Sequence, residues 1–425
     1  MSDQILREEN LRLKRAVEEL SILNDLARTI GGSLNSQEVM HTIIRRSLRA
    51  INAEQGVITL VDEPGSDSGK TLIRTAVSSA ERGPFHLNQA LLGWMHLNKK
   101  PLLINDPNRD DRFKGVKWDD TIRSLVCVPM IVKSALIGTL TVYNKKGSTA
   151  FSEDDQRLLS IIAAQSAQIV ENARLYEEEL RLRKMQEELH LASRIQMDLL
   201  PKTVPEIAGY QVAGKSLPAQ QVGGDYFDFI KIDSHRWAFC LGDVSGKGLP
   251  ASLLMANLQA TLRGQTLSDL PPAECIRRSN RLLYYSTSSE KFATAFYGIL
   301  DTQRHTLKFS NAGHDSPYVL GVQDTVARLQ TGGVPLGMLE EFPYEEEEVQ
   351  INTGDLLVVY SDGVTEAWNT DEVEFGEERL SKVLHQFHDK TASELIDSIF
   401  AAVKAHTASA PQADDITLVV LKRLS

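Results

Sequence analysis

The sequence has 425 residues, of which 42% are hydrophobic and 24% charged, and its formal net charge at pH 7 is −11. This length predicts two domains with connecting helices, and the composition excludes wholesale disorder. The acidic balance argues against a nucleic-acid-binding or anionic-membrane surface. Three distant cysteines without CxxC spacing (Cys127, Cys240 and Cys275) suit a reducing cytosol and exclude a cysteine-based zinc site.

The N-terminal segment predicts helices. Residues 1–20 are charged throughout, which argues against a signal peptide. Leucine recurs every seven residues at Leu6, Leu13 and Leu20, which is typical of a helix that packs against a partner. After a glycine pair, the stretch SQEVMHTIIRRSLRAI predicts a second helix that opens at Ser36.

Short β-branched runs follow. Residues 56–77 predict a hairpin around the loop EPGSDSGK, and residues 90–98 predict a short helix. The stretch SLVCVPMIVKSALIGTLTVY predicts two buried strands rather than a membrane span, because Lys133-Ser134 interrupts it. Ser152 and three acidic residues then open a long helix. We therefore expect an α+β domain over 21–172, an antiparallel sheet with flanking helices.

The long helix continues into a predicted linker at 173–203. Its apolar seams recur every seven residues and comprise Leu175, Leu182 and Leu189 on one side and Met185, Ala192 and Leu199 on the other. This spacing favours a parallel coiled coil, and hence a homodimer formed through helices 1–30 and 173–200. The alternative is an amphipathic helix that packs on its own domain. Pro201 and Pro205 then lead into a second domain at 204–425.

Aspartates stand at strand boundaries four times in this second domain. They are Asp225 before YFDFIKI, Asp243 after RWAFCLG, Asp362 after DLLVVYS, and Asp414-Asp415 before ITLVVLK. A single strand-end aspartate is usually a turn or cap residue. Four carboxylates brought together would repel one another unless cations neutralise them, and all-oxygen ligands select Mg²⁺ or Mn²⁺. The pattern therefore predicts a site for two divalent ions.

These motifs have two other possible interpretations. The stretch FCLGDVSGKGLPAS does not fit a phosphate-binding Walker loop, because only three residues separate Gly242 from Gly246 and Gly248 follows Lys247. Lys247 is instead expected to be a turn residue. The stretch GGDYFDF is similar to the GGDEF signature of diguanylate cyclases, but Tyr226 replaces its acidic residue. A cyclase-like enzyme stays as an alternative that would consume GTP.

Seven motifs occur together in an order that resembles the SpoIIE/RsbU-type serine/threonine phosphatases of the PPM (type-2C-like) group. They are ASRIQMDLLPKTVP, GGDYFD, LGDVSGKGLPASLLMA, NAGH, GGVPLGM, GDLLVVYSDGVTEAWN and ADDITLVV. The resemblance implies an α/β/β/α sandwich with two antiparallel sheets and a centre of two Mn²⁺ or Mg²⁺ ions.

The resemblance also implies ligands and catalytic groups. Asp243 would bridge both ions, the Val244 backbone carbonyl would bind one of them, and Asp225 would bind the substrate-distal ion. Asp362 and Asp414 would bind the other, with Asp414 preferred over Asp415. His314 in NAGH is either a turn residue, which we favour, or a general acid for the leaving group.

The first domain resembles a GAF sensor domain over the strands VCVPMIV and ALIGTLTVYN and the long exit helix. Asn144-Lys145, Phe151 and Asp155 are similar to the NKFDE signature of cyclic-nucleotide-binding GAF domains, but Gln156 replaces its glutamate. A small-molecule ligand is expected in this domain.

We therefore predict a cytoplasmic, homodimeric phosphoprotein phosphatase regulated by its GAF domain, with neither nucleic acid nor membrane as a partner. The resemblance implies that its substrate is a phosphorylated STAS-domain anti-sigma-factor antagonist in a partner-switching pathway. The helix ASLLMANLQATLRG follows Asp243 directly and is the expected lever between sensor and site. The alternative is a catalytically silent PPM-fold signalling or binding module.

Overall fold

The computed structural model describes residues 36–61, 74–78, 89–148, 150–287, 290–321 and 326–425. The chain divides into two compact units, Met1–Met185 and Gln186–Ser425. Their boundary falls within the segment predicted as a linker. The predicted N-terminal helix, the dimer segment 1–30 and the loop EPGSDSGK lie outside the described residues.

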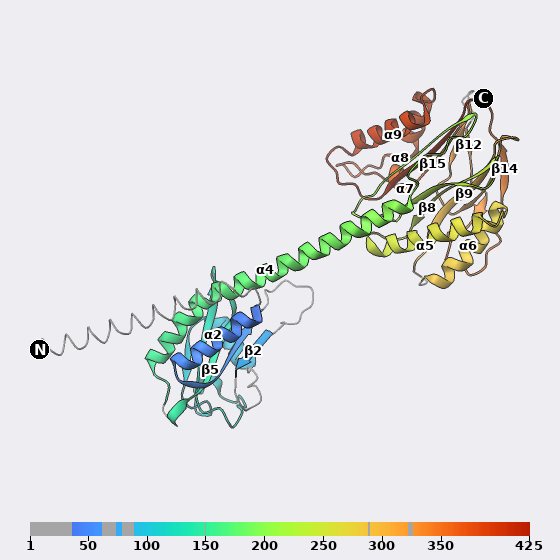
Figure 1. Ribbon diagram of the computed structural model, residues 1–425. Coiled ribbons are helices and arrows are strands. Elements are labelled where there is room, and N and C mark those ends of the chain that lie inside the picture. The colour runs from blue at the N-terminus through green and yellow to red at the C-terminus, as the bar shows by residue number, and fades with distance from the viewer. Residues whose placement is uncertain (1–35, 62–73, 79–88, 149, 288–289, 322–325) are drawn as a thin grey trace, which may run out of the picture. The chain divides into compact units, whose positions relative to one another are not determined.

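The first unit contains a five-stranded antiparallel sheet with the order β2-β1-β5-β4-β3 (Figure 1). Its strands are β1 (Ala53–Leu60), β2 (Arg74–Ser78), β3 (Leu102–Ile104), β4 (Leu125–Val132) and β5 (Ala135–Lys145). Strands β4 and β5 form the predicted hairpin, and Lys133 and Ser134 both take the positive φ that a two-residue hairpin turn requires. Among the described helices, none combines the length and apolarity that crossing a bilayer demands.

Helices cover both faces of this sheet. The helices are α2 (Ser36–Ala50), α3 (Gln89–Asn98) and the first part of α4 (Glu153–Leu199), with 3-10 turns η1 (Asp111–Phe113) and η2 (Lys146–Ser148). Helices α2 and α4 share one buried core with the sheet, in which Ile43 and Ile162 are fully buried. Leu91 of α3 joins Phe113 and Trp118 in a second core. The predicted α+β architecture is confirmed.

Helix α4 changes its surroundings along its length. One face of its first part, which includes Leu159, Ile162 and Val170, is buried in the first unit, whereas Leu199 packs on a core of the second unit. Between them, Leu175, Leu182 and Met185 are 50%, 56% and 59% exposed. The helix is continuous over 153–199; these three seam residues are exposed, whereas Leu189 and Ala192 are half-buried. The coiled coil itself stays a prediction.

The second unit contains two sheets. One has the order β13-β10-β9-β8-β7 with β14 paired to β10, and the other has the order β12-β11-β15-β16-β6. The first comprises β7 (Tyr226–Lys231), β8 (Arg236–Val244), β9 (Ala293–Asp301), β10 (Thr306–Ala312), β13 (Gly332–Gly333) and β14 (Glu347–Gln350). The second comprises β6 (Tyr210–Leu217), β11 (Tyr318–Leu320), β12 (Val326–Arg328), β15 (Leu356–Tyr360) and β16 (Ile416–Arg423).

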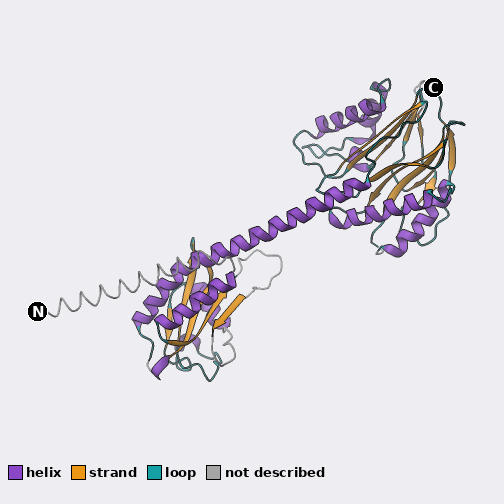
Figure 2. Cartoon of the chain, viewed as in Figure 1, coloured by secondary structure: helices purple, strands orange, loops and turns teal. Residues whose placement is uncertain are grey.

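The sheets pack face to face, and a pair of helices covers each outer face (Figures 1 and 2). The helices are α5 (Leu249–Thr266), α6 (Pro272–Ser286), α7 (Asp362–Thr365), α8 (Gly376–Gln386) and α9 (Ala392–Thr407). Phe239, Phe296 and Val419 lie in the core between the sheets. Helices α5 and α6 share a core with the first sheet, and α8 and α9 share one with the second. This is the predicted α/β/β/α sandwich.

Candidate functional site

Strand pairing gathers the predicted aspartates at one edge of the sandwich. Tyr226 pairs with Gly242 in the β7–β8 ladder, so Asp225 and Asp243 end neighbouring strands of the first sheet. In the second sheet Tyr360 pairs with Leu418, so the residues that follow β15 lie beside those that precede β16. Asp362 and Asp414 occupy these two positions. Four aspartates that are distant in the sequence thus meet at this carboxylate edge.

Asp415 links the two sheets through hydrogen bonds to the backbone. Its Oδ2 accepts from the N–H of Gly224 at 2.6 Å, and its Oδ1 accepts from the N–H of Ala219 at 2.7 Å. A Cβ atom at Gly223 would lie 2.3 Å from the same Oδ2, so only glycine fits there. The buried Asp415 carboxylate is therefore occupied in positioning the loop before Asp225, whereas Asp414 is partly exposed.

The grouped carboxylates raise one another's pKa. Burial, followed by repulsion from Asp243, raises the pKa of Asp225 well above its ordinary value. Burial and repulsion from Asp362 and Asp414 raise the pKa of Asp243 to about 7. The pKa of Asp362 is raised by burial and then by Asp414. The edge therefore attracts cations, because each negative charge destabilises its neighbours.

The donor set of this edge fits divalent ions that prefer oxygen ligands. Asp225 Oδ2 is buried without a hydrogen-bond partner among the described residues. A Cβ atom at Gly224 would lie 3.0 Å from the carbonyl oxygen of Val244 and 3.5 Å from Asp243 Oδ1, so this glycine leaves both oxygens accessible. Across the described ranges, no three acidic, histidine or cysteine side chains form a ready-made ligand cluster. Carboxylate and carbonyl oxygens such as these are the donors that Mg²⁺ and Mn²⁺ prefer.

Lys247 contacts the carboxylate edge, although its side chain is 46% exposed. Its Nζ is 2.8 Å from Asp414 Oδ2 and donates to the carbonyl oxygen of Ala413 at 2.5 Å. The positive φ of Gly246 and Gly248 shapes the loop that brings Lys247 there. The prediction of a turn residue is correct for its position, but sequence reasoning missed its partner, because Asp414 is distant in the sequence.

His314 is part of a buried turn next to the edge. Asn311 accepts from the His314 N–H at 2.7 Å and donates to its carbonyl oxygen at 3.0 Å. The imidazole Nδ1 lies 2.9 Å from Thr294 Oγ1, and Thr294 pairs with Asp243 across β8 and β9. Burial lowers the pKa of His314 to about 4, so the ring is neutral at pH 7. This environment agrees with a structural histidine.

Asp315 is a titratable group that sequence reasoning missed. Burial, followed by repulsion from Asp362 and Glu377, raises its pKa to about 6. Asp315 belongs to the turn after β10, not to one of the four strand boundaries. The only signal in the sequence was its position directly after NAGH.

The two units match known families. Residues 233–424 match Stage II sporulation protein E (SpoIIE), a range that contains Asp243, Asp362 and Asp414 but begins after Asp225. Residues 33–171 match the GAF domain. The second unit is therefore a SpoIIE-type phosphatase domain of the PPM class, and it follows an N-terminal GAF domain.

Individual relatives agree with this assignment. The chain is 28% identical over 253 residues to phosphoserine phosphatase RsbU of Bacillus subtilis, covering 58% of the chain and 75% of RsbU. It is 29% identical over 264 residues to protein IcfG of Synechocystis sp., covering 56% of the chain and 41% of IcfG. The SiaA-PP2C domain of Pseudomonas aeruginosa shares the fold, with a TM-score of 0.50 and 22% identity over 57% of this chain and 98% of that domain.

Proposed function

We propose that this protein is a metal-dependent phosphatase that removes phosphate from serine or threonine residues of a protein. The observation that carries the proposal is the carboxylate edge, where burial and like charges raise the pKa values of Asp225, Asp243 and Asp362, and where Asp225 Oδ2 is buried without a hydrogen-bond partner among the described residues. Membership of the PPM phosphatase class supports it. The name of RsbU, a phosphoserine phosphatase, supports phosphoserine as the substrate group.

The family resemblance supplies the proposed ligands, and the oxygens at the carboxylate edge are compatible with them. Asp225, Asp243 and the Val244 carbonyl would hold one Mn²⁺ or Mg²⁺, and Asp243, Asp362 and Asp414 would hold the second. When bound, two such ions would supply an activated water and would stabilise the oxygens of an in-line phosphoryl displacement. Asp415 positions the loop that carries Asp225, and the neutral His314 contacts Thr294, which pairs with Asp243 in the β8–β9 ladder.

Helix α5, which is predicted to transmit the signal to the site, begins just after the loop that follows Val244. Helix α5 starts at Leu249, five residues after Val244, and its Ala251 and Leu254 pack in the core that contains Val244. A shift of this helix would therefore move the Val244 carbonyl and Asp243. We propose that the GAF domain controls this shift through α4, whose exposed apolar seam would pair with a second copy in a homodimer. Deletion of residues 1–172 should change both the activity and the oligomeric state. If the activity and the oligomeric state were both unchanged, this regulation would be contradicted.

The proposed substrate is a phosphorylated STAS-domain anti-sigma-factor antagonist, in a partner-switching pathway in the cytoplasm. The similarity to RsbU supports this pathway, and three free, buried cysteines agree with a reducing compartment. Purified full-length protein should release phosphate from such a phosphoprotein in the presence of Mn²⁺ and should lose this activity in EDTA.

Manganese-dependent hydrolysis of p-nitrophenyl phosphate separates the proposal from the alternatives. Turnover by the full chain, or by residues 200–425, supports the phosphatase. A chain that binds Mn²⁺ but turns over neither this compound nor a phosphoprotein would be the silent PPM-fold module. Consumption of GTP would support the cyclase alternative.

A further inference from the structure

A cavity of about 490 Å³ lies in the phosphatase domain beside the carboxylate edge. Helix α9, the end of β6 and the loop before β16 form its walls. Most of its surface is apolar, with Trp368, Phe400, Val403 and Ile416 among the lining residues. This volume is within the range of ligand sites, about 300–1000 Å³. The proposed dephosphorylation chemistry does not by itself account for the cavity.

Polar contacts hold the walls of the cavity in place. Gln412 Nε2 donates to the carbonyl oxygens of Leu217 and Asp414, both at 2.8 Å, and so ties the loop to the end of β6. Between β6 and α9, Lys215 pairs with Asp397 at 2.8 Å and lies 4.9 Å from the centre of the Phe400 ring. The cavity is therefore formed before any ligand binds, which limits the entropy lost on binding.

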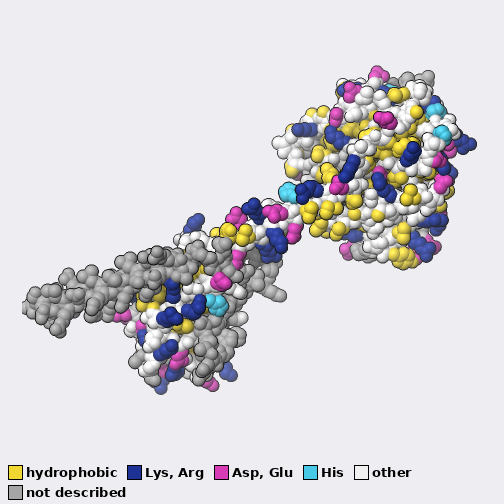
Figure 3. Space-filling model, viewed as in Figure 1, with side chains coloured by type: hydrophobic (Ala, Val, Ile, Leu, Met, Phe, Trp, Pro, Cys, Tyr) yellow, Lys and Arg dark blue, Asp and Glu magenta, His cyan; other side chains and the backbone are white. Residues whose placement is uncertain are grey.

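The cavity is continuous with the carboxylate edge. Asp414 and Gly363 line it, and Gly363 directly follows Asp362. At the other side of Asp414 lies Lys247, so a phosphoryl group at the edge and a ligand in the cavity would be immediate neighbours. Trp368 in the lining is 42% exposed, and partly exposed tryptophans are favoured anchors in protein interfaces. Hydrophobic and basic side chains are interspersed on the face of this unit that is visible in Figure 3.

We propose that this cavity is a specificity subsite that binds an apolar side chain of the phosphoprotein, one to three residues from the phosphorylated residue. The proposal rests on the proposed phosphatase function. An extended peptide advances about 3.4 Å per residue, so side chains at these positions reach a cavity that begins at Asp414. Apolar walls favour leucine-like or aromatic side chains, because a polar side chain would lose its water without gaining hydrogen bonds.

The experiment uses the full chain and synthetic phosphoserine peptides. A single leucine is moved from three residues before the phosphoserine to three residues after it, in an asparagine background. Ala401→Trp fills the cavity, and Ala405→Trp places the same side chain on the same helix at a residue that does not line the cavity. Trp368→Ala opens the rim instead of filling the cavity, and thermal unfolding checks that each variant folds.

We expect at least one leucine position to raise kcat/KM about tenfold, mainly through a lower KM. Ala401→Trp and Trp368→Ala should remove this preference, whereas Ala405→Trp should keep it. Hydrolysis of p-nitrophenyl phosphate should be unchanged in all three variants. The proposal is overturned if every leucine position gives the same kcat/KM, or if Ala401→Trp lowers peptide and p-nitrophenyl phosphate turnover in parallel.

Binding in EDTA separates this inference from the phosphatase proposal. Fluorescence anisotropy of the labelled peptides should show the same leucine preference in the wild-type chain without any turnover, and Ala401→Trp should abolish it. If the Mn²⁺-loaded chain hydrolyses nothing but this preference is present, the phosphatase proposal fails and the subsite stands. Equal binding of all peptides would contradict the subsite even in an active enzyme.

Discussion

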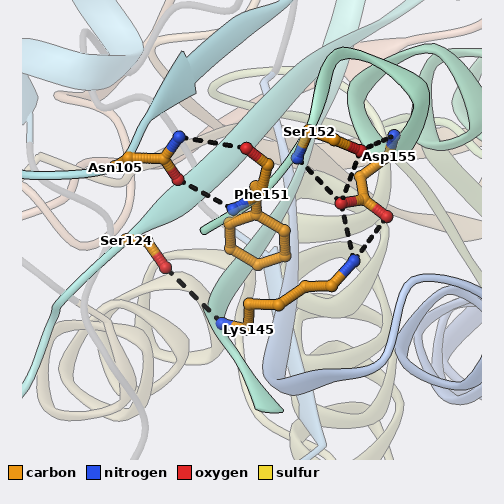
Figure 4. A network of polar contacts seen from close by, with 6 residues as sticks. All are labelled: Asn105, Ser124, Lys145, Phe151, Ser152 and Asp155. Atoms are coloured by element: carbon orange, nitrogen blue, oxygen red, sulfur yellow. Dashed lines mark hydrogen bonds and ion pairs between the residues drawn. The ribbon is translucent and has the colours of Figure 1, made fainter. Parts of the chain in front are cut away.

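The GAF domain and the phosphatase domain both bury aspartates, but they surround them differently. In the GAF domain, Lys145 contacts both oxygens of Asp155 at 2.6 Å, and the N–H and hydroxyl of Ser152 also donate to Asp155 (Figure 4). The side chains of this pair are only 17% and 13% exposed. At the carboxylate edge, by contrast, Asp225, Asp243 and Asp362 face one another as like charges.

These different surroundings indicate a structural role for Asp155 and a functional role for the aspartates of the carboxylate edge. Burial alone would raise the pKa of Asp155, but hydrogen bonds from Lys145 and Ser152 hold it below its ordinary value. At the carboxylate edge, burial and like charges raise the pKa values instead. The Lys145–Asp155 pair thus fastens the start of α4 to β5, whereas the edge is stable in its charged form only with added cations.

The largest expected effect is that of Asp243→Asn. This change removes a proposed ligand of both ions, so Mn²⁺-dependent hydrolysis should fall at least 10²–10³-fold, a typical loss for a group that stabilises transition-state charge. The same change relieves like-charge repulsion, so the metal-free phosphatase domain should unfold at a higher temperature. Activity assays and calorimetry in EDTA measure the two effects. Retained activity would contradict the metal assignment.

Addition of Mn²⁺ tests, without a mutation, whether the ion stabilises the phosphatase domain and not the GAF domain. At a concentration about 100 times Kd, an ion that binds only the folded state stabilises it by about 2.7 kcal/mol. In calorimetry of the full chain, the transition of the phosphatase domain should therefore move up by about 5–10 °C. The GAF transition serves as the internal control and should not move. If only the GAF transition moved, Mn²⁺ would bind the GAF domain, and this would contradict the metal assignment.

Asp155→Asn should destabilise its domain, whereas Asp243→Asn should stabilise the metal-free phosphatase domain. Loss of the carboxylate leaves Lys145 partly buried without its partner, so the GAF domain should lose about 1–3 kcal/mol of unfolding free energy at pH 7. Because the folded pKa of Asp155 is lowered, this contribution is present above its unfolded pKa of about 3.9 and is lost as the pH falls through the folded value.

Calorimetry at several pH values measures this loss. The wild-type and Asp155→Asn transitions of the GAF domain should therefore converge in acid. Glu153→Gln, an exposed acid in the same turn, is the matched control and should change the stability by only a few tenths of a kcal/mol. A constant difference between wild type and variant at every pH would contradict the ionic origin.

The smallest expected effect concerns Lys247, the cation already present at the edge. Its ammonium occupies Asp414 and competes there with an added ion. Because exposed ion pairs contribute only about 0.2–1 kcal/mol, Lys247→Met should tighten Mn²⁺ binding by roughly 1.4- to 5-fold. Isothermal titration measures this affinity, and weaker binding in the variant would show that Lys247 supports the site instead.

The sequence by itself determined the elements and the candidate ligands. Alternating β-branched runs, the turn at Lys133-Ser134 and the cap at Ser152 predicted their strands and helix, because local propensity and hydrophobic period agree there. Aspartates at strand boundaries, each flanked by glycine or by a second acid, indicated Asp225, Asp243, Asp362 and Asp414, since such positions are rigid and accessible.

Only the tertiary structure decided how these residues divide their roles. Asp414 and Asp415 are adjacent in the sequence, but the register of β16 against β6 turns Asp415 toward the Gly224 N–H and leaves Asp414 beside Lys247. Burial keeps His314 neutral, and the cavity beside Asp414 exists because α9 and the loop before β16 pack against β6. These facts depend on contacts between residues far apart in the chain, and local sequence patterns do not encode which distant partner each side chain meets.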